Sequence, residues 1–211
     1  MGYDKGTISK EKIVQAAAGV VLAQGYAATS IADLSKAAHT SAGKLTHHFP
    51  TKMDLFEAVF EATTSLFKAG PLTLLGDKSH PPKRRIDDFF DAMYRLYAGL
   101  EDPIGCPVGH AAGDSEGVSA SMRAKAFDYL KETEKLFEAA FLELGDTPSV
   151  ARSKGIAFVN AWQGAVVMAR GGGGIQHIDR VFRSLRSMTG LGLSHSEKPS
   201  KKPAAKSLRK Q

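Results

Sequence analysis

Two short helices on either side of a tight turn are the strongest structural constraint in this sequence, and they lie between residues 30 and 54. Ser30 with Asp33 forms a capping box, in which a side-chain oxygen and a carboxylate satisfy the free N–H groups at a helix start. Thr51 and Asp54 repeat this pattern after a proline that cannot continue the preceding helix. The stretch therefore predicts a helix, a turn, a second short helix and the capped start of a third.

The second short helix, residues 41–49, carries side chains that can meet another molecule. Leu45 and Phe49 are expected to point into the core. The others are small, polar or cationic, and such groups can approach base edges and phosphates: Ala42, Gly43, Lys44, Thr46, His47 and His48. The pattern predicts a DNA-binding helix-turn-helix, although periodicity alone leaves an ordinary αα-hairpin as an alternative.

Residues 9–60 resemble the N-terminal domain of tetracycline-repressor-type (TetR family) regulators. The matching positions are Ile13, Ala16, Ala17, Gly25, Tyr26, Thr29, Ser30, Ile31, Leu34, Ala38, Ser41, Gly43, Leu45, His47, His48, Phe49, Pro50, Thr51, Lys52, Leu55 and Phe56. The resemblance implies an all-α fold with three parts. These are an N-terminal three-helix helix-turn-helix DNA-binding domain (residues 1–53), a C-terminal helical ligand-binding and dimerisation domain (54–190) and a basic disordered tail (191–211).

The same resemblance implies roles at double-stranded operator DNA. Lys44 and Thr46 are expected nearer the bases, whereas the adjacent His47 and His48 and also Lys52 are expected to contact the DNA backbone. The expected DNA-binding set is completed by Thr29, Ser41, Ala42 and Gly43.

Two positions depart from the family pattern. His39 stands where these regulators usually have a turn glycine, so we predict a positive φ there, which histidine tolerates better than most residues. Thr46 replaces the usual aromatic residue of the recognition helix, so the base preference of the family is not carried over.

Composition limits the class of protein. Of the 211 residues 43% are hydrophobic, which is enough for a real core, and no apolar run approaches the length of a membrane span. The N-terminus is polar and lacks the core of a signal peptide, so a cytoplasmic protein without a membrane partner is expected. A single cysteine excludes an intrachain disulfide. No cluster with catalytic or metal-ligand spacing is visible, so we expect no enzyme, no cofactor and no metal site.

Most of the net charge of +6 belongs to the tail, where six cationic side chains face a single glutamate between residues 191 and 211. The composition of this segment predicts disorder. Its charge is therefore no evidence of specific DNA binding, although an architectural, nonspecific DNA binder that relies on the tail is an alternative of another class.

The sequence predicts about nine helices and no convincing strand. Besides the helix-turn-helix pair, the expected helices cover residues 9–24, 51–68, 83–100, a short segment after 107, 119–144, 148–170 and a last helix from 175. Gly70 with Pro71 and the polar stretch 76–82 are predicted to form a loop, and four glycines at 171–174 to break the chain.

The segment from Ile156 to Ala169 is apolar nearly all round, with only Asn160 and Gln163 polar. Such a helix is not expected on the wet surface of a monomer. Paired with the amphipathic last helix, it is expected to form half of a four-helix dimer bundle, as in the resembled family. The expected homodimer contacts are Val159, Val166, Ile178 and Phe182, and a central core helix of a monomer is the alternative.

An effector pocket is expected inside the C-terminal helices. Its candidate lining residues are Tyr94, Tyr97, Cys106, His110, Phe127, Trp162 and Met168, each of the aromatic ones also compatible with plain core. Because Pro107 is expected to begin a helix, Cys106 would stand at its N-terminus, where the helix dipole favours a thiolate. Residues 105–109 also resemble a segment at the pocket wall in a subset of these regulators. The alternative is a buried, inert cysteine.

These patterns together predict a ligand-responsive, sequence-specific transcriptional regulator, most simply a repressor that a small molecule releases from its operator. Two recognition helices must enter major grooves one turn apart, about 34–36 Å, and a ligand that favours another separation lowers operator affinity. The rival within this class is a sensor of electrophiles or oxidants that acts through Cys106.

Overall fold

The computed structural model describes residues 9–99, 105–114 and 116–189. Within these ranges the helices are α1 (Lys10–Ala28), α2 (Ile31–Ala37), α3 (Ala42–His48), α4 (Lys52–Phe67), α5 (Thr73–Gly76), α6 (Pro82–Ala98), α7 (Pro107–Gly113), α8 (Ala120–Glu143), α9 (Pro148–Met168) and α10 (Gly174–Met188). Two π-helical turns, η1 (Lys68–Leu72) and η2 (Ala169–Gly173), join neighbouring helices. No strand occurs in these ranges, so the all-α prediction is confirmed. The predicted tail at 191–211 lies outside them.

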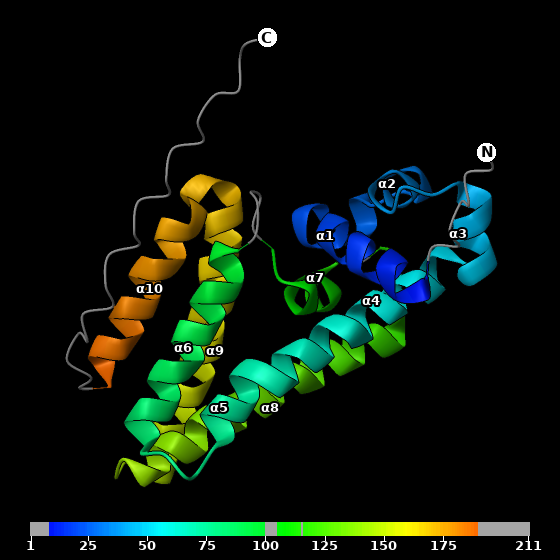
Figure 1. Cartoon of the computed structure of the whole chain (residues 1–211). Helices are drawn as coiled ribbons and strands as arrows, with labels where there is room; N and C mark the ends of the chain where they lie inside the picture. The colour runs from blue at the N-terminus through cyan, green and yellow to red at the C-terminus, as the bar shows by residue number, and fades with distance from the viewer. Residues whose placement is uncertain (1–8, 100–104, 115, 190–211) are drawn as a thin grey trace, which may run out of the picture.

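The first three helices gather at one end of the molecule, and α4 leads away from them alongside α8 (Figure 1). Ion pairs between Lys68 and Glu132 and between Lys125 and Glu61 cross between these two long helices. Helices α6, α9 and α10 stand beside one another in the rest of the chain, and the short α7 lies between them and α1 (Figure 1). Helix α7 therefore lies where the two parts of the molecule meet.

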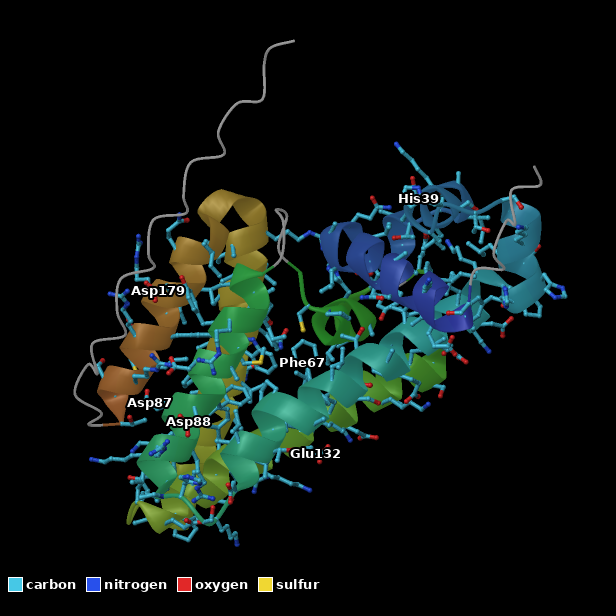
Figure 2. The ribbon with its side chains drawn as sticks, in the orientation of Figure 1. His39, Phe67, Asp87, Asp88, Glu132 and Asp179 are labelled. Atoms are coloured by element: carbon cyan, nitrogen blue, oxygen red, sulfur yellow. The ribbon has the colours of Figure 1, made fainter. Side chains whose placement is uncertain are left out.

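Local sequence signals explain the helix-turn-helix. Both predicted capping boxes are present, at Ser30 with Asp33 and at Thr51 with Asp54. The turn between α2 and α3 places His39 at a φ of 49°, which confirms the predicted positive φ at this non-glycine position (Figure 2). The core of this end is apolar and buried: Ile13, Ala17, Val21, Leu34, Ala38, Leu45, Phe49 and Leu55.

The chain between α4 and α6 differs from the predicted loop. Helix α4 ends at Phe67, close to the expected end, but η1, which contains Pro71, continues the helical path into the one-turn α5. Only residues 77–81 form the predicted loop. Proline lacks an N–H and its ring crowds the carbonyl four residues earlier, and a wider π turn accommodates both effects. Leu72 and Leu75 are buried, so their burial also favours a helical path here. The one-turn α5 is the helix that was absent from the nine predicted helices.

The glycine run breaks the helical path as predicted. Gly172 and Gly174 have φ values of 115° and 56°, and η2 turns the chain from α9 into α10. Behind this turn, aromatic rings from four helices form the centre of the C-terminal core: Phe89 and Phe90 on α6, Phe137 and Phe141 on α8, Phe158 and Trp162 on α9, and Phe182 on α10. No helix among the described residues is long and apolar enough to cross a membrane.

The capping carboxylates predict a pH effect on stability. Hydrogen bonds from Thr51, from its side chain first and then from its backbone N–H, hold the pKa of Asp54 below its ordinary value of 3.8. A lowered folded-state pKa gives stability that is present above the unfolded pKa and is lost as the pH falls through the folded-state value. We therefore expect Asp54→Asn to cost stability at pH 7 and progressively less below about pH 4. Urea unfolding between these pH values measures the difference, with Asp128→Asn on the exposed face of α8 as control.

Candidate nucleic-acid interface and effector cavity

Helix α3 presents an exposed surface made of the residues predicted to meet DNA. The Ser41 hydroxyl caps the helix by accepting a hydrogen bond from the Lys44 N–H at 3.3 Å. Leu45 anchors α3 in the core with no exposed area. Around this anchor Ser41, Ala42, Gly43, Lys44, Thr46 and His47 are exposed and His48 is half-buried. The arrangement leaves a small, polar and cationic face free to enter a groove.

The other two predicted DNA contacts lie at the start of α4 and the end of α1. The Lys52 ammonium donates to the Thr29 carbonyl at 3.0 Å and lies 5.2 Å from the centre of the Phe56 ring. Thr29 itself is only 1% exposed, and its hydroxyl donates to the Gly25 carbonyl at 2.6 Å. The expected role of Thr29 therefore needs correction, because its side chain closes the end of α1 and does not reach the surface.

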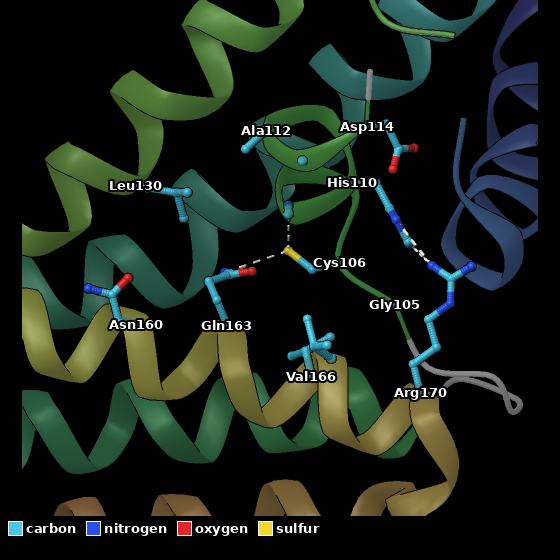
Figure 3. A pocket seen from close by; sticks show the side chains of 13 residues that line it. Gly105, Cys106, His110, Ala112, Asp114, Leu130, Asn160, Gln163, Val166 and Arg170 are labelled. Atoms are coloured by element: carbon cyan, nitrogen blue, oxygen red, sulfur yellow. Dashed lines mark hydrogen bonds between the residues drawn. The ribbon is translucent and has the colours of Figure 1, made fainter. Parts of the chain in front are cut away.

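A cavity of about 530 Å³ lies between α7, α8 and α9. Its walls are Gly105, Cys106, Gly109, His110, Ala112, Gly113 and Asp114 from α7 and its flanks, Leu130 from α8, and Asn160, Gln163, Val166, Val167 and Arg170 from α9 and η2 (Figure 3). The volume falls in the range of small-molecule sites, which is about 300–1,000 Å³.

Cys106 stands at the N-terminus of α7, and its sulfur accepts a hydrogen bond from the Gly109 N–H at 3.4 Å. The thiol is only 3% exposed, and burial raises its pKa despite the hydrogen bonds that it accepts. The expected thiolate therefore needs correction, since desolvation outweighs the helix dipole. Behind the thiol, Trp162 donates to the Tyr97 hydroxyl at 3.0 Å in the buried core.

His110 lies between the cavity and α1. The Nη1 atom of Arg170 approaches its Nε2 at 2.7 Å and its Nδ1 at 3.1 Å (Figure 3). Burial lowers the pKa of His110 below 6.5 and the Arg170 charge lowers it further, against smaller opposing effects of Asp114 and of the Leu22 carbonyl. The imidazole is therefore neutral near pH 7.

The α7 segment is held closely against the end of α1. The Asp114 carboxylate accepts a hydrogen bond from the Tyr26 N–H at 3.2 Å. Gly105 approaches the Leu22 carbonyl so closely that an added Cβ would lie 2.0 Å from its oxygen. At Gly117, which has a φ of 74°, an added Cβ would lie 2.8 Å from the carbonyl carbon of Tyr26. We call these contacts, together with the hydrogen bond of His110 to the Leu22 backbone, the α1–α7 joint; three of its residues, Gly105, His110 and Asp114, also line the cavity.

The structure brings together only part of the predicted pocket. Cys106 and His110 line the cavity, whereas Tyr97 and Trp162 lie in the core behind it and Tyr94 is half-buried on α6. Phe127 and Met168 are each 59% exposed and do not line it, because both point away from the packed faces of their helices.

Sequence reasoning missed four polar lining residues, Asp114, Asn160, Gln163 and Arg170. For the last three a signal existed in the sequence. Asn160 and Gln163 were the polar positions of an otherwise apolar segment, and Arg170 follows Gln163 at a spacing of seven residues, which is the same helical face.

The four residues that were predicted to contact a partner protomer do not lie on the surface. Val159, Val166, Ile178 and Phe182 are buried within a single protomer, where Phe182 packs on Phe90 at 4.7 Å between ring centres. They therefore cannot reach a partner without opening the core. The exposed face of α9 is made instead of small and apolar residues around one asparagine: Ile156, Ala157, Asn160, Gly164, Val167 and Met168. We call this set the α9 outer face.

Comparisons with known proteins agree with this architecture. Residues 13–59 match the family described as bacterial regulatory proteins, tetR family, and residues 82–184 match the LmrA/YxaF-like transcriptional regulator C-terminal domain. The chain is 24% identical over 163 residues to the HTH-type transcriptional repressor DhaR of Mycobacterium sp. (strain GP1), covering 75% of this chain and 80% of that protein. It is 50% identical to the HTH-type transcriptional regulator CymR of Pseudomonas putida over 50 residues, 24% of this chain and 25% of that protein.

Solved structures show the same fold. A TetR transcriptional regulator from Legionella pneumophila superposes with a TM-score of 0.73 at 23% identity, covering 89% of this chain and 99% of that one. The regulatory protein TetR from Rhodobacter sphaeroides gives a TM-score of 0.74 at 20% identity, covering 85% and 98%. With both of its parts matched by domains of one family, this chain belongs to the TetR family of DNA-binding transcriptional regulators.

Proposed function

We propose that this protein is a homodimeric repressor that leaves its operator when a small molecule binds in the cavity between α7, α8 and α9. The observation that supports this most directly is the double role of α7. His110 and Asp114 line the cavity and at the same time contact the end of α1. A ligand in the cavity must therefore touch the element that holds the DNA-binding end in place.

The mechanism follows from linkage. A dimer reads two half-sites only while its recognition helices are one DNA turn apart. A ligand that binds more tightly to a conformation with another spacing lowers operator affinity by its difference in affinity between the two states. In this proposal the α1–α7 joint transmits the change, because a shift of α7 moves α1 through the Asp114–Tyr26 hydrogen bond.

The homodimer is proposed to form through the α9 outer face together with α10. Gly164 has no atom within 4 Å of where a Cβ would stand, so a partner helix can approach closely there. TetR-family regulators act as dimers, and a two-fold protein suits a two-fold operator.

The two alternatives receive less support. A thiol sensor needs an accessible thiolate, whereas Cys106 is buried and its pKa is raised. An architectural DNA binder would rely on the basic tail at 191–211, and a sharp footprint that survives removal of this tail excludes that function.

Substitutions on α3 test the specific DNA contacts. We expect Lys44→Ala and Thr46→Ala to weaken operator binding by about 1–3 kcal/mol wherever a good base contact is lost, and to change the sequence preference. Lys52→Ala should weaken binding to all sequences alike. Quantitative footprinting on the operator and on unrelated duplex measures both effects.

The control is a chain truncated after residue 189, which should keep its footprint. The outcome that contradicts the assignment is a footprint that is lost with the tail and untouched by the α3 substitutions. Effector control is tested by compounds that raise the melting temperature of the protein, since those that bind the cavity should also release the operator.

A further inference from the structure

Arg170 lines the cavity and has no acidic partner among the residues that the structure describes. Three arginines in the described part of the chain are not exposed, namely Arg85, Arg170 and Arg186. Arg85 pairs with Glu143, and Arg186 pairs with Asp87 and Asp91. Arg170 makes no ion pair with any residue that the structure describes. Cationic side chains that are partly withdrawn from water are normally paired, so this exception points to a ligand.

The neighbours of Arg170 do not neutralise it. A guanidinium has five N–H donors, and the recorded acceptors here are the ring nitrogens of His110, of which a neutral imidazole offers only one. The Asp114 carboxylate belongs to the same cavity wall, but its Oδ2 accepts the Tyr26 N–H of α1, and it forms no ion pair with Arg170. Most donors of Arg170 are therefore left for another acceptor.

The other residues that line the cavity indicate what kind of molecule carries that acceptor. The cavity wall also includes the apolar residues Ala112, Leu130, Val166 and Val167 and the amides of Asn160 and Gln163 on α9. Figure 3 shows Ala112 and Leu130 across the cavity from Arg170. A single guanidinium is planar and matches a carboxylate through two parallel hydrogen bonds. A dianion such as a phosphate would meet only one cation in this site.

We infer that the effector is a small organic carboxylate whose anionic group pairs with Arg170 beside His110 and whose apolar body lies against Ala112, Leu130 and Val166. This inference rests on the proposed function, because it names the class of ligand for the same cavity. It adds the requirement that the effector is negatively charged, which the proposed function by itself does not include.

A carboxylate at this position also has a consequence for pH. The charged groups that face His110 are Arg170, which opposes its protonation, and Asp114 on its own helix, which favours it together with the Leu22 carbonyl of α1. A bound carboxylate offsets the Arg170 charge, so it favours the protonated imidazole. Carboxylate affinity should therefore rise as the pH falls below about 6.5, measured at pH values where the ligand itself stays ionised.

Direct binding without DNA tests the inference. The probes are benzoate, cyclohexanecarboxylate and octanoate, each compared by calorimetry with its primary amide, which keeps the shape and removes the charge. We expect at least one carboxylate to bind about tenfold or more tightly than its amide. Arg170→Met should bring this ratio close to one, and Arg170→Lys, which keeps the charge without the planar fork, should leave part of it. Arg95→Met, an exposed arginine of α6, is the matched control and should leave the ratio unchanged.

Three results overturn the inference: equal affinity for carboxylate and amide, a preference that survives Arg170→Met, or no binding of any carboxylate up to about 10 mM. Melting temperature and operator binding of the unliganded variants show that they are folded. Operator release separates this inference from the proposed function. If the compounds that bind the cavity and release the operator are neutral, the carboxylate inference is wrong and the proposed function stands. A carboxylate that binds through Arg170 and leaves the operator complex intact contradicts effector control.

Discussion

Gly105→Ala is expected to force α7 away from α1 and to lower the free energy of unfolding by about 1–3 kcal/mol. The new Cβ would lie 2.0 Å from the Leu22 carbonyl oxygen and 2.8 Å from Nε2 of His110. The histidine ring can rotate, but a backbone carbonyl within α1 cannot, so the helices must separate. Because the α1–α7 joint is proposed to carry the effector signal, a compound that still binds the cavity should release the operator less effectively.

Urea unfolding and operator release by a cavity-binding compound measure the two effects. Gly19→Ala on α1 is the control, since it lies outside the cavity and no atom lies within 4 Å of its added Cβ, and it should be neutral or slightly stabilising. Normal stability together with normal release in Gly105→Ala would show that α1 and α7 are not held as described.

Gly164→Glu is expected to abolish the homodimer and with it the operator footprint. In a single protomer this position is exposed and open, so glutamate should be tolerated and should even favour the helix over glycine. In a dimer that packs through the α9 outer face, the same carboxylate would be buried without a partner, which costs several kcal/mol.

Light scattering gives the mass, circular dichroism shows that the helices persist, and footprinting gives the DNA readout. Ala124→Glu, at an exposed position of α8, is the control and should stay dimeric. Gly155→Ala provides a contrast on the same helix as Gly164, because its Cβ would lie 2.7 Å from the Glu134 carbonyl of α8 and should damage the fold itself. A Gly164→Glu protein that remains a dimer refutes the proposed interface.

The DNA-binding end could be predicted from the sequence because its signals are local. Ser30 with Asp33 and Thr51 with Asp54 are three residues apart, so each cap depends only on its own turn of chain. The burial of Leu45 followed from the periodicity of α3, whereas the positive φ of His39 followed from the family resemblance, since these regulators usually have a turn glycine there. Family resemblance over residues 9–60 then supplied the DNA-binding role that periodicity alone left open.

The C-terminal site was predicted less well because its signals are not local. Helix α9 is apolar on almost every side, so its sequence cannot tell which apolar positions α8 and α10 cover. The expected contacts Val159 and Val166 are inside, whereas Gly164 and Val167 are outside. In the same way aromatic composition suggested pocket residues, but Trp162 fills the core.

The sequence by itself determined an all-helical chain with a capped helix-turn-helix, because caps, turns and helical periodicity depend on residues close together in the chain; its family resemblance added the role of a regulator. Only the tertiary structure decided which faces of α9 are covered and that burial, rather than the helix dipole, governs the pKa of Cys106. It also decided that Arg170 contacts His110, sixty residues away in the sequence. Burial and charge compensation depend on which helices pack together, and that packing joins residues far apart in the sequence.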